Sequence, residues 1–355
     1  MWIEKRLRDL QRLSLSRHAY GLGWRTAAER FLELTGPRRF SPDEVFLLGL
    51  MNPTIAHGDL DRYISKEAML ARQNAVNPKE HHRLTEDKLV FYRHCREHDL
   101  PTPTVFGAWV SSVESPVEVP VANSEQAWVD MCRQLPTDDL VLKPVGGVHG
   151  QGVMLLRRDG SRFVTHDKKS LDALGLLREM KASGYRDWIF QERLHAHRKI
   201  AQFTGSDNLQ TARVVTWIDD SHVPHTLFAW LRVIGGSTAF DNFNFGASGN
   251  FAATIDISNG TLAYALGSAR NGLGLQDVSI HPSSGQPFAG FKIPYGHEIF
   301  ELTARAAQAF KPLVTVGWDV AITDSGVALI EGNVTWDPLP TRENLGGMIA
   351  ALSPN

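Results

Sequence analysis

Two acidic residues near the end of the chain are spaced so that a β-hairpin would bring them together. Segment 315–333 has the pattern of two strands joined by a short polar turn. A three-residue turn after Thr323 would pair Thr323 with Val327 and would set Asp319 opposite Glu331. Facing residues on antiparallel strands have Cβ atoms about 5 Å apart, and like charges there repel. A pair of carboxylates held in this way therefore requires a reason.

A hard metal cation would supply that reason. Asn333 lies two residues after Glu331 and projects from the same face as the two carboxylates. Three oxygen donors suit Mg²⁺ better than Zn²⁺ or copper. The opposite face of the hairpin would be buried, and it carries Val320, Ile322, Ala328 and Ile330. A solvated polar face is the alternative, and we rank it below the metal site.

A lysine followed by closely spaced glycines forms the second motif. Lys143 ends a buried strand, and Gly146, Gly147, Gly150 and Gly152 follow. Glycine lets successive backbone N–H groups turn toward one anion, and lysine adds a point charge to the same phosphates. The order differs from a P-loop, in which the lysine follows the glycines. On this motif alone, a phosphate-binding loop and an ordinary hairpin turn are equally supported.

Segment 188–194 is an apolar strand that ends in polar residues and resumes with Leu194. It would suit a hinge whose backbone bonds the edge of an adenine while Leu194 packs on the ring, although most such segments are only strand ends. His195 and His197 could share one face, but two histidines without a third ligand are more typical of polar surface groups than of a zinc site.

Two arginines stand inside otherwise apolar strands, Arg213 and Arg232. A buried arginine is costly unless a carboxylate or a phosphate pairs with it. A role toward a substrate anion and a structural salt bridge remain equally supported.

Strands and helices alternate without a regular βαβ rhythm, so we predict an α+β fold with antiparallel sheets. A mostly helical stretch reaches about residue 83 and is followed by a helix that starts at Thr85. The other predicted helices span 124–134, 171–181 and 297–310. The predicted strands are 104–110, 140–143, 153–156, 188–191, two within 213–234, and the two of the hairpin.

Composition is that of an ordinary globular protein, with 43% hydrophobic and 21% charged residues and a net charge of −2. That charge gives no sign of a nucleic-acid partner. No apolar segment approaches the ~20 residues of a membrane span. The basic residues of the N-terminal helix are more typical of a solvent-exposed helix face than of a helix that lies on a membrane. The two cysteines, Cys95 and Cys132, suggest small buried side chains in a cytoplasmic protein.

Taken together and in order, these motifs resemble the ATP-grasp superfamily, in particular its sugar-transfer-associated branch. The resemblance covers residues 85–336. It rests on 87–88 before 100–103, on 142–152, on 191–197, on 211–216, on 241–243, on 281–282, on 317–321 and on 329–333.

The resemblance implies two α+β lobes that sandwich ATP, after a helical region at 1–84. The small lobe would be 85–190 and the large lobe 191–355. Mg²⁺, which Mn²⁺ could replace, would bind Asp319, Glu331 and Asn333, and Arg213 and Arg232 would balance charge at the reacting groups. The residues implied to bind the nucleotide are Lys88, Lys143, Gly146, Gly147, Gly150, Gly152, Gln191, Glu192, Leu194 and His197.

The activity that the resemblance implies is ligation of a small-molecule carboxylate to an amine through an acyl phosphate, with a tie to polysaccharide or secondary-metabolite biosynthesis. A small-molecule or sugar kinase with the same ATP site is one alternative. A non-catalytic nucleotide-binding partner of a glycan assembly is the other, although such a protein would not need opposed carboxylates. The oligomeric state is left open.

Overall fold

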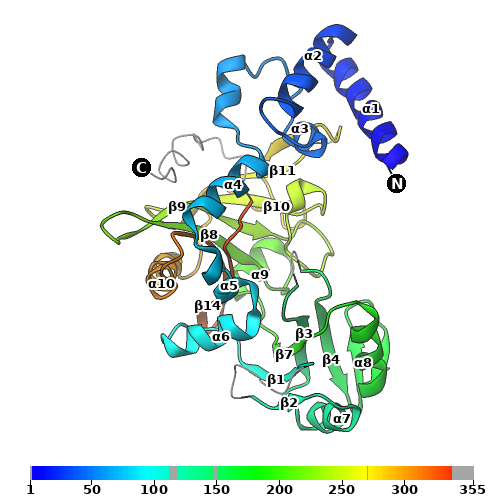
Figure 1. The fold of residues 1–355 in the computed structure, drawn as a ribbon, viewed down its shortest axis with the longest axis vertical. Helices are drawn as coiled ribbons and strands as arrows, with labels where there is room; N and C mark the ends of the chain where they lie inside the picture. Colours follow the sequence, from blue (N-terminus) through cyan, green and yellow to red (C-terminus); the bar gives the residue numbers. More distant parts are fainter. Residues whose placement is uncertain (1, 112–118, 148–149, 270, 338–355) are drawn as a thin grey trace.

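The chain begins with a helical region, as the sequence predicts (Figure 1). The computed structural model describes residues 2–111, 119–147, 150–269 and 271–337. Val148 and His149 of the predicted glycine loop, and the predicted large lobe after residue 337, lie outside the described residues. The first helices are α1 (Trp2–Ala19), α2 (Trp24–Thr35), α3 (Pro42–Leu47), η1 (His57–Arg62), α4 (Lys66–Val76), η2 (Lys79–His81), α5 (Arg83–Glu86) and α6 (Lys88–Glu97).

A seven-stranded, mostly antiparallel sheet forms the small lobe, in the order β2-β1-β7-β3-β4-β5-β6. Helices α7 and α8 cover one of its faces around the fully buried Trp128 and Phe190 (Figure 1). The elements are β1 (Val105–Trp109), β2 (Val121–Ala122), α7 (Glu125–Gln134), β3 (Asp139–Pro144), β4 (Met154–Asp159), β5 (Arg162–Thr165), β6 (Ser170–Asp172), α8 (Ala173–Ala182) and β7 (Trp188–Glu192).

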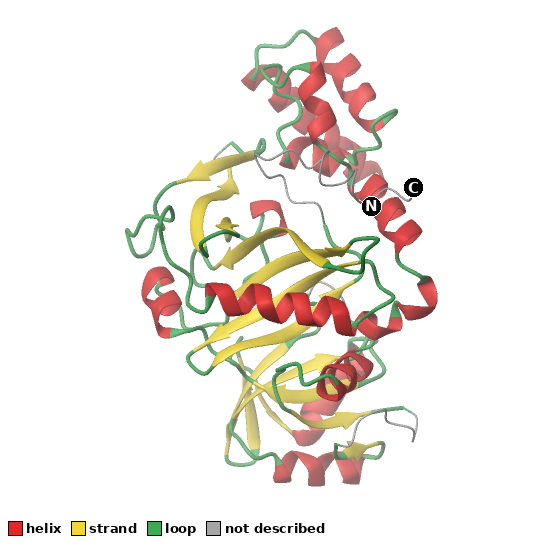
Figure 2. Ribbon diagram, turned by 90° about the vertical axis from the view of Figure 1, so that its left-hand side faces the viewer, coloured by secondary structure: helices red, strands yellow, loops and turns green. Residues whose placement is uncertain are grey.

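A second seven-stranded sheet, entirely antiparallel, forms the large lobe, in the order β12-β11-β10-β9-β8-β13-β14. Helix α10 crosses one face of it (Figure 2). The elements are α9 (Arg198–Thr204), β8 (Thr211–Ile218), β9 (Pro224–Val233), η3 (Asn244–Gly246), β10 (Phe251–Asp256), β11 (Thr261–Ser268), β12 (Leu275–Val278), α10 (Gly296–Ala309), β13 (Thr315–Thr323) and β14 (Gly326–Asn333).

The α+β prediction and most predicted elements are confirmed. One helix start is wrong: Asp87, not Thr85, caps α6, because its carboxylate accepts the N–H groups of Leu89 and Val90. Thr85 instead lies inside the short helix α5. The change from one sheet to the other falls between β7 and β8, so the predicted lobe boundary after residue 190 lies inside β7.

Helix α6 belongs to neither lobe alone. Its residues Leu89, Phe91 and Tyr92 pack into the core of the large lobe, with the buried Cys95 among them. Its first N–H, that of Lys88, donates to the carbonyl of Val145 at the end of β3 in the small lobe. One helix therefore contacts both halves of the fold.

No helix within the described ranges is long and apolar enough to span a bilayer. Cys95 and Cys132 are unpaired and buried, and burial raises the pKa of each thiol.

The helical region docks on the large lobe through a close backbone contact. A Cβ atom added at Gly274 would lie 2.9 Å from the Cα atom of Gly49. Gly274 also has a φ of +100°, which side chains rarely adopt. Leu273 beside it joins the apolar core of the helical region. The segment before β12 therefore anchors that region.

We expect Gly274→Ala to lower the free energy of unfolding by about 2 kcal/mol or more, because it adds a backbone clash to an unfavourable φ. Gly272→Ala is the matched control, since Gly272 has a φ of +71° with no atom near its would-be Cβ. It should cost only about 1 kcal/mol. Urea unfolding measures both, and equal losses would contradict the docking contact.

Candidate nucleotide and metal site

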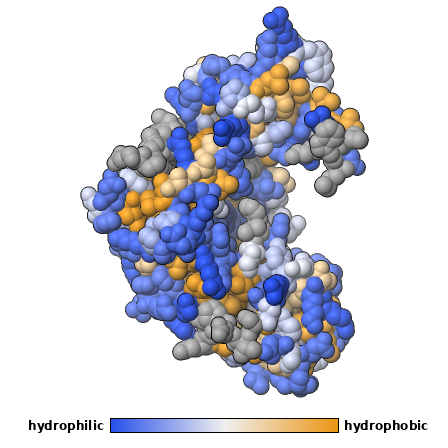
Figure 3. All heavy atoms as spheres, in the orientation of Figure 1, coloured by the Kyte–Doolittle hydropathy of each residue, from blue (hydrophilic) through white to orange (hydrophobic). Residues whose placement is uncertain are grey.

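A cavity of about 710 Å³ opens between the two lobes. Figure 3 shows the molecule hollowed on the side where the lobes face each other. Most of the predicted site residues line it: Lys88, Lys143, Gly147, Gly150, Gln191, Glu192, Leu194, Arg213, Arg232, Asp319, Glu331 and Asn333. The structure thus brings together residues that are up to 245 positions apart, from Lys88 to Asn333.

Three predicted residues do not line this cavity. Gly146 lines a shallow neighbouring groove, and Gly152 packs against Pro144 and Tyr185. The ring of His197 accepts the N–H of Lys199 and so caps α9, with its other nitrogen 3.6 Å from Asp324. His197 therefore has a structural role as a helix cap and is not part of the cavity lining.

The hairpin β13–β14 places the two carboxylates opposite each other, but by a different register from the predicted one. The turn has two residues, so Thr323 pairs with Gly326 and not with Val327. A β-bulge then leaves Ile330 without a partner, and this extra residue restores the pairing of Asp319 with Glu331. The predicted turn was wrong, and the predicted carboxylate pair is correct because the two differences cancel.

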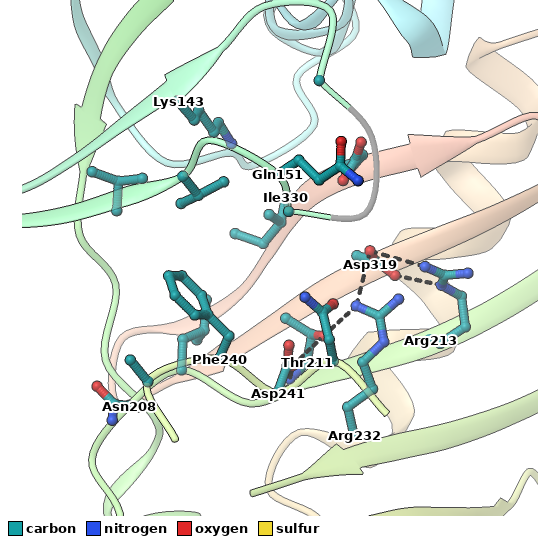
Figure 4. Close-up of a pocket in the computed structure, with 18 of the residues that line it drawn as sticks. Lys143, Gln151, Asn208, Thr211, Arg213, Arg232, Phe240, Asp241, Asp319 and Ile330 are labelled. Carbon is teal, nitrogen blue, oxygen red and sulfur yellow. Dashed lines mark hydrogen bonds and ion pairs between the residues drawn. The ribbon is translucent and has the colours of Figure 1, made fainter. Parts of the chain in front are cut away.

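The bulge also corrects the predicted location of Ile330. The sequence assigned it to the buried apolar face of the hairpin, together with Val320 and Ile322. Val320 and Ile322 are fully buried there, whereas Ile330 lines the cavity (Figure 4). An unpaired bulge residue turns its side chain away from the regular alternation.

Asp319 is held by both predicted arginines. Both Nε and Nη2 of Arg213 bond to its carboxylate, and Nη1 of Arg232 lies 3.1 Å from Oδ2 (Figure 4). Burial alone would raise the pKa of Asp319, but the two guanidinium groups outweigh burial, and the pKa is lowered. The lowered pKa favours the ionised carboxylate, and both arginines form the salt bridge that was one of their two predicted alternatives.

Arg232 lies between two carboxylates, one of which the predicted site did not include. Asp241 accepts the N–H and hydroxyl of Thr211 at 2.8 and 2.7 Å, and Arg232 reaches the same hydroxyl at 3.3 Å. Burial raises the pKa of Asp241, although the charge of Arg232 opposes the shift. In the sequence Asp241 was noted only as part of the stretch 241–243. That stretch alone does not indicate that Thr211, 30 residues away, is its partner.

Two lysines face the carboxylates from the other side. Lys88 Nζ donates to the Gly147 carbonyl at 2.7 Å and lies 3.6 Å from a Glu331 oxygen. Lys143 Nζ donates to the Tyr92 hydroxyl at 2.8 Å. Burial, together with the charge of Lys88, lowers the pKa of Lys143 to about 7. Two buried lysines close together favour a polyanion between them.

The apolar part of the cavity suits a flat ring. Its lining includes Val141, Leu155, Leu194 and Ile330, beside the chain segment that leaves β7. The buried Gln191 side chain donates to the carbonyl of Pro103, so it braces the strand next to this pocket. This arrangement fits the predicted adenine hinge.

The donor set on the hairpin fits a hard cation. In the described part of the chain no group of three or more His, Cys, Asp or Glu side chains is placed to hold a metal. The hairpin brings two carboxylates and one amide, those of Asp319, Glu331 and Asn333, to the cavity. The arginines use three N–H groups on Asp319, and a carboxylate has about four acceptor positions. Asn333 donates through Nδ2 to the Gly317 carbonyl, which leaves Oδ1 for a ligand.

Comparison with protein families gives a match to the family described as sugar-transfer associated ATP-grasp, over residues 70–342. A comparison with curated proteins found no match.

Three of the solved structures that match this chain are distant from it. The biotin carboxylase domain of 2-oxoglutarate carboxylase from Hydrogenobacter thermophilus, in complex with MgADP and bicarbonate, is 11% identical with a TM-score of 0.42, covering 84% of this chain and 52% of that one. The ATP-grasp ligase PsnB is 16% identical with a TM-score of 0.37, covering 78% and 64%. An L-amino acid ligase from Bacillus licheniformis is 12% identical with a TM-score of 0.34, covering 71% and 41%. The chain thus spans less than two thirds of each of these proteins.

A pH dependence follows from Lys143. Its pKa of about 7 means that half of the side chains are uncharged at neutral pH. A bound polyphosphate favours the charged form and raises the pKa, so binding takes up a proton at pH above 7. We expect nucleotide affinity to fall by up to about tenfold per pH unit above pH 7.

Calorimetry at pH 8 in two buffers of different ionisation enthalpy measures the proton uptake. Lys143→Met, which keeps the length of the side chain without its charge, should bind more weakly and without that proton. Equal uptake by the wild type and the variant would contradict the assignment.

Proposed function

The chain belongs to the sugar-transfer associated ATP-grasp family, and we propose that it is an ATP- and Mg²⁺-dependent ligase that joins a carboxylate to an amine. The observation that carries the proposal is one cavity in which paired lysines face opposed carboxylates. Lys88 and Lys143 line this cavity together with Asp319 and Glu331, and Lys143 and Asp319 are labelled in Figure 4.

The lysines and the glycine loop would bind the phosphates of ATP. Lys88 ties Gly147 to Glu331, so the loop, the helix and the hairpin would be held around the phosphates together. The adenine would lie against Leu194 and Ile330. Asp319, Glu331 and Asn333 would hold Mg²⁺, which neutralises charge on the transferred phosphoryl group.

The substrate carboxylate would bind near Arg232. An oxygen of that carboxylate attacks the γ-phosphorus of ATP, the bond to the bridging oxygen breaks, and ADP leaves. The amine nitrogen then attacks the acyl carbon, inorganic phosphate leaves, and the amine proton passes to solvent. The chain's own contribution is position and charge, because phosphoryl transfer needs little covalent help.

Room for the co-substrates lies beyond the carboxylates. The cavity lining also includes Trp230, Asn242 and Lys66 of α4, which pairs with Asp337 at 2.7 Å. The helical region therefore contributes a charged side chain to the substrate end. The family description supports sugar-linked biosynthesis as the setting. We propose small-molecule acids and amines as the substrates and the cytoplasm as the location.

Hydroxylamine trapping tests the reaction. With Mg·ATP and a panel of carboxylic acids, a ligase produces ADP and an acyl phosphate that hydroxylamine converts to a hydroxamate. A stable phosphorylated product without a hydroxamate would identify a kinase. ATP turnover at background with every acid would support a non-catalytic nucleotide-binding protein.

We expect Glu331→Gln to lower the trapped rate by about 100-fold, because a metal contributes several kcal/mol to charge neutralisation in the transition state. Glu301→Gln, an exposed change on α10 whose partner is His297, is the matched control and should leave the rate unchanged. A rate that survives in Glu331→Gln would contradict the metal role of this carboxylate.

A further inference from the structure

Helix α6 inserts two polar side chains between the lobes, one turn apart. Lys88 and Tyr92 are four residues apart and so lie on the same face of the helix. Lys88 contacts the glycine loop and Glu331. Tyr92 contacts Lys143 of β3 and Ile330 of β14. Each side chain therefore contacts both the end region of β3 in the small lobe and strand β14 of the large lobe.

The hydroxyl of Tyr92 has a definite hydrogen-bond direction. It has one proton, and the carbonyl of Ile330 is the nearer acceptor at 2.7 Å, against 3.4 Å for the Gln191 side chain. Its oxygen accepts a hydrogen bond from the Lys143 amine at 2.8 Å. Burial strongly raises the pKa of the phenol, so it stays neutral and keeps its proton. Tyr92 thus donates to the hairpin and accepts from the lysine.

The carbonyl that Tyr92 binds is that of the bulge residue. Ile330 is the extra residue of the β-bulge and has no partner in β13. The next residue is Glu331, whose position opposite Asp319 depends on this bulge. The Tyr92 bond therefore fixes the backbone at the point where the register of the carboxylate pair is set.

The lysine that Tyr92 holds has its other protons available. Lys143 is 5% exposed and lines the cavity. Within the described residues its ammonium donates to Tyr92, and its remaining N–H groups face the cavity. Its amine also lies 5.1 Å from the centre of the Tyr92 ring, which restricts where the ammonium can point.

We propose that Tyr92 is a positioning residue that couples the phosphate-binding lysine Lys143 to the carboxylate register of the β13–β14 hairpin. The proposal rests on the proposed nucleotide function. Loss of the hydroxyl releases two groups at once: the ammonium of Lys143 and the bulge carbonyl before Glu331. A tyrosine that only fills the core would need its ring and not its hydroxyl.

Tyr92→Phe tests the coupling, because it keeps the ring and removes the hydroxyl. Calorimetry would measure ATP affinity without Mg²⁺, and a titration would measure the Mg²⁺ concentration that gives half of the maximal ATP binding. We expect about tenfold weaker ATP binding without metal and at least a threefold higher Mg²⁺ requirement. Tyr20→Phe is the matched control, since its hydroxyl bonds the Leu273 carbonyl far from the cavity; it should change neither value.

A double-mutant cycle with Lys143→Met separates the effect on metal-free ATP affinity from the effect on the Mg²⁺ requirement. In that background Tyr92→Phe should no longer weaken metal-free ATP binding, because the ammonium is gone, but it should still raise the Mg²⁺ requirement. If Tyr92→Phe alone fails to fold around an unpartnered ammonium, the Lys143→Met background provides the comparison for the Mg²⁺ requirement.

An unchanged Mg²⁺ requirement, or an equal loss of metal-free affinity in both backgrounds, would overturn the coupling. These outcomes differ from failure of the proposed function, in which the wild type itself binds no ATP or is indifferent to Glu331→Gln.

Discussion

A single extra residue in β14 sets the geometry on which the site depends. Without the bulge at Ile330, the two-residue turn of the hairpin would put Asp319 opposite Ile330, and Glu331 would point to the other face. With the bulge, Asp319 and Glu331 share the cavity face, and Ile330 joins the apolar wall of the cavity. The bulge removes one regular pair from the ladder, and the hydroxyl of Tyr92 donates to the carbonyl of the bulge residue, Ile330.

The charges around that hairpin compensate one another across the cavity. Asp319 is ionised because Arg213 and Arg232 surround it, whereas Lys143 is partly discharged because it is buried near Lys88. Asp319 is therefore a negatively charged group that can help to bind a cation. Lys143 is a lysine that becomes protonated when an anion binds next to it. Both features favour a metal–polyphosphate complex over either component alone.

Sequence patterns predicted the features that depend on residues close together in the chain. The hairpin, Lys143 and the first turn of its glycine loop were evident from residue type and spacing. Contacts across the fold were not: Tyr92 meets Ile330 across 238 positions, and no periodicity reveals such a pair. Asp241 was visible only as part of a stretch. Strand β10 was missed because its Ala252 and Ala253 have weak strand propensity, and the hairpin turn was misjudged because turn length and bulge trade against each other.

Anomalous scattering from crystals grown with Mn²⁺ and a non-hydrolysable ATP analogue tests the central claim most directly. The account predicts a metal peak at the β13–β14 hairpin, about 2.1 Å from oxygens of Asp319 and Glu331, with the triphosphate between that peak and Lys143. A nucleotide outside the cavity between the lobes, or a metal bound away from both carboxylates, would contradict it.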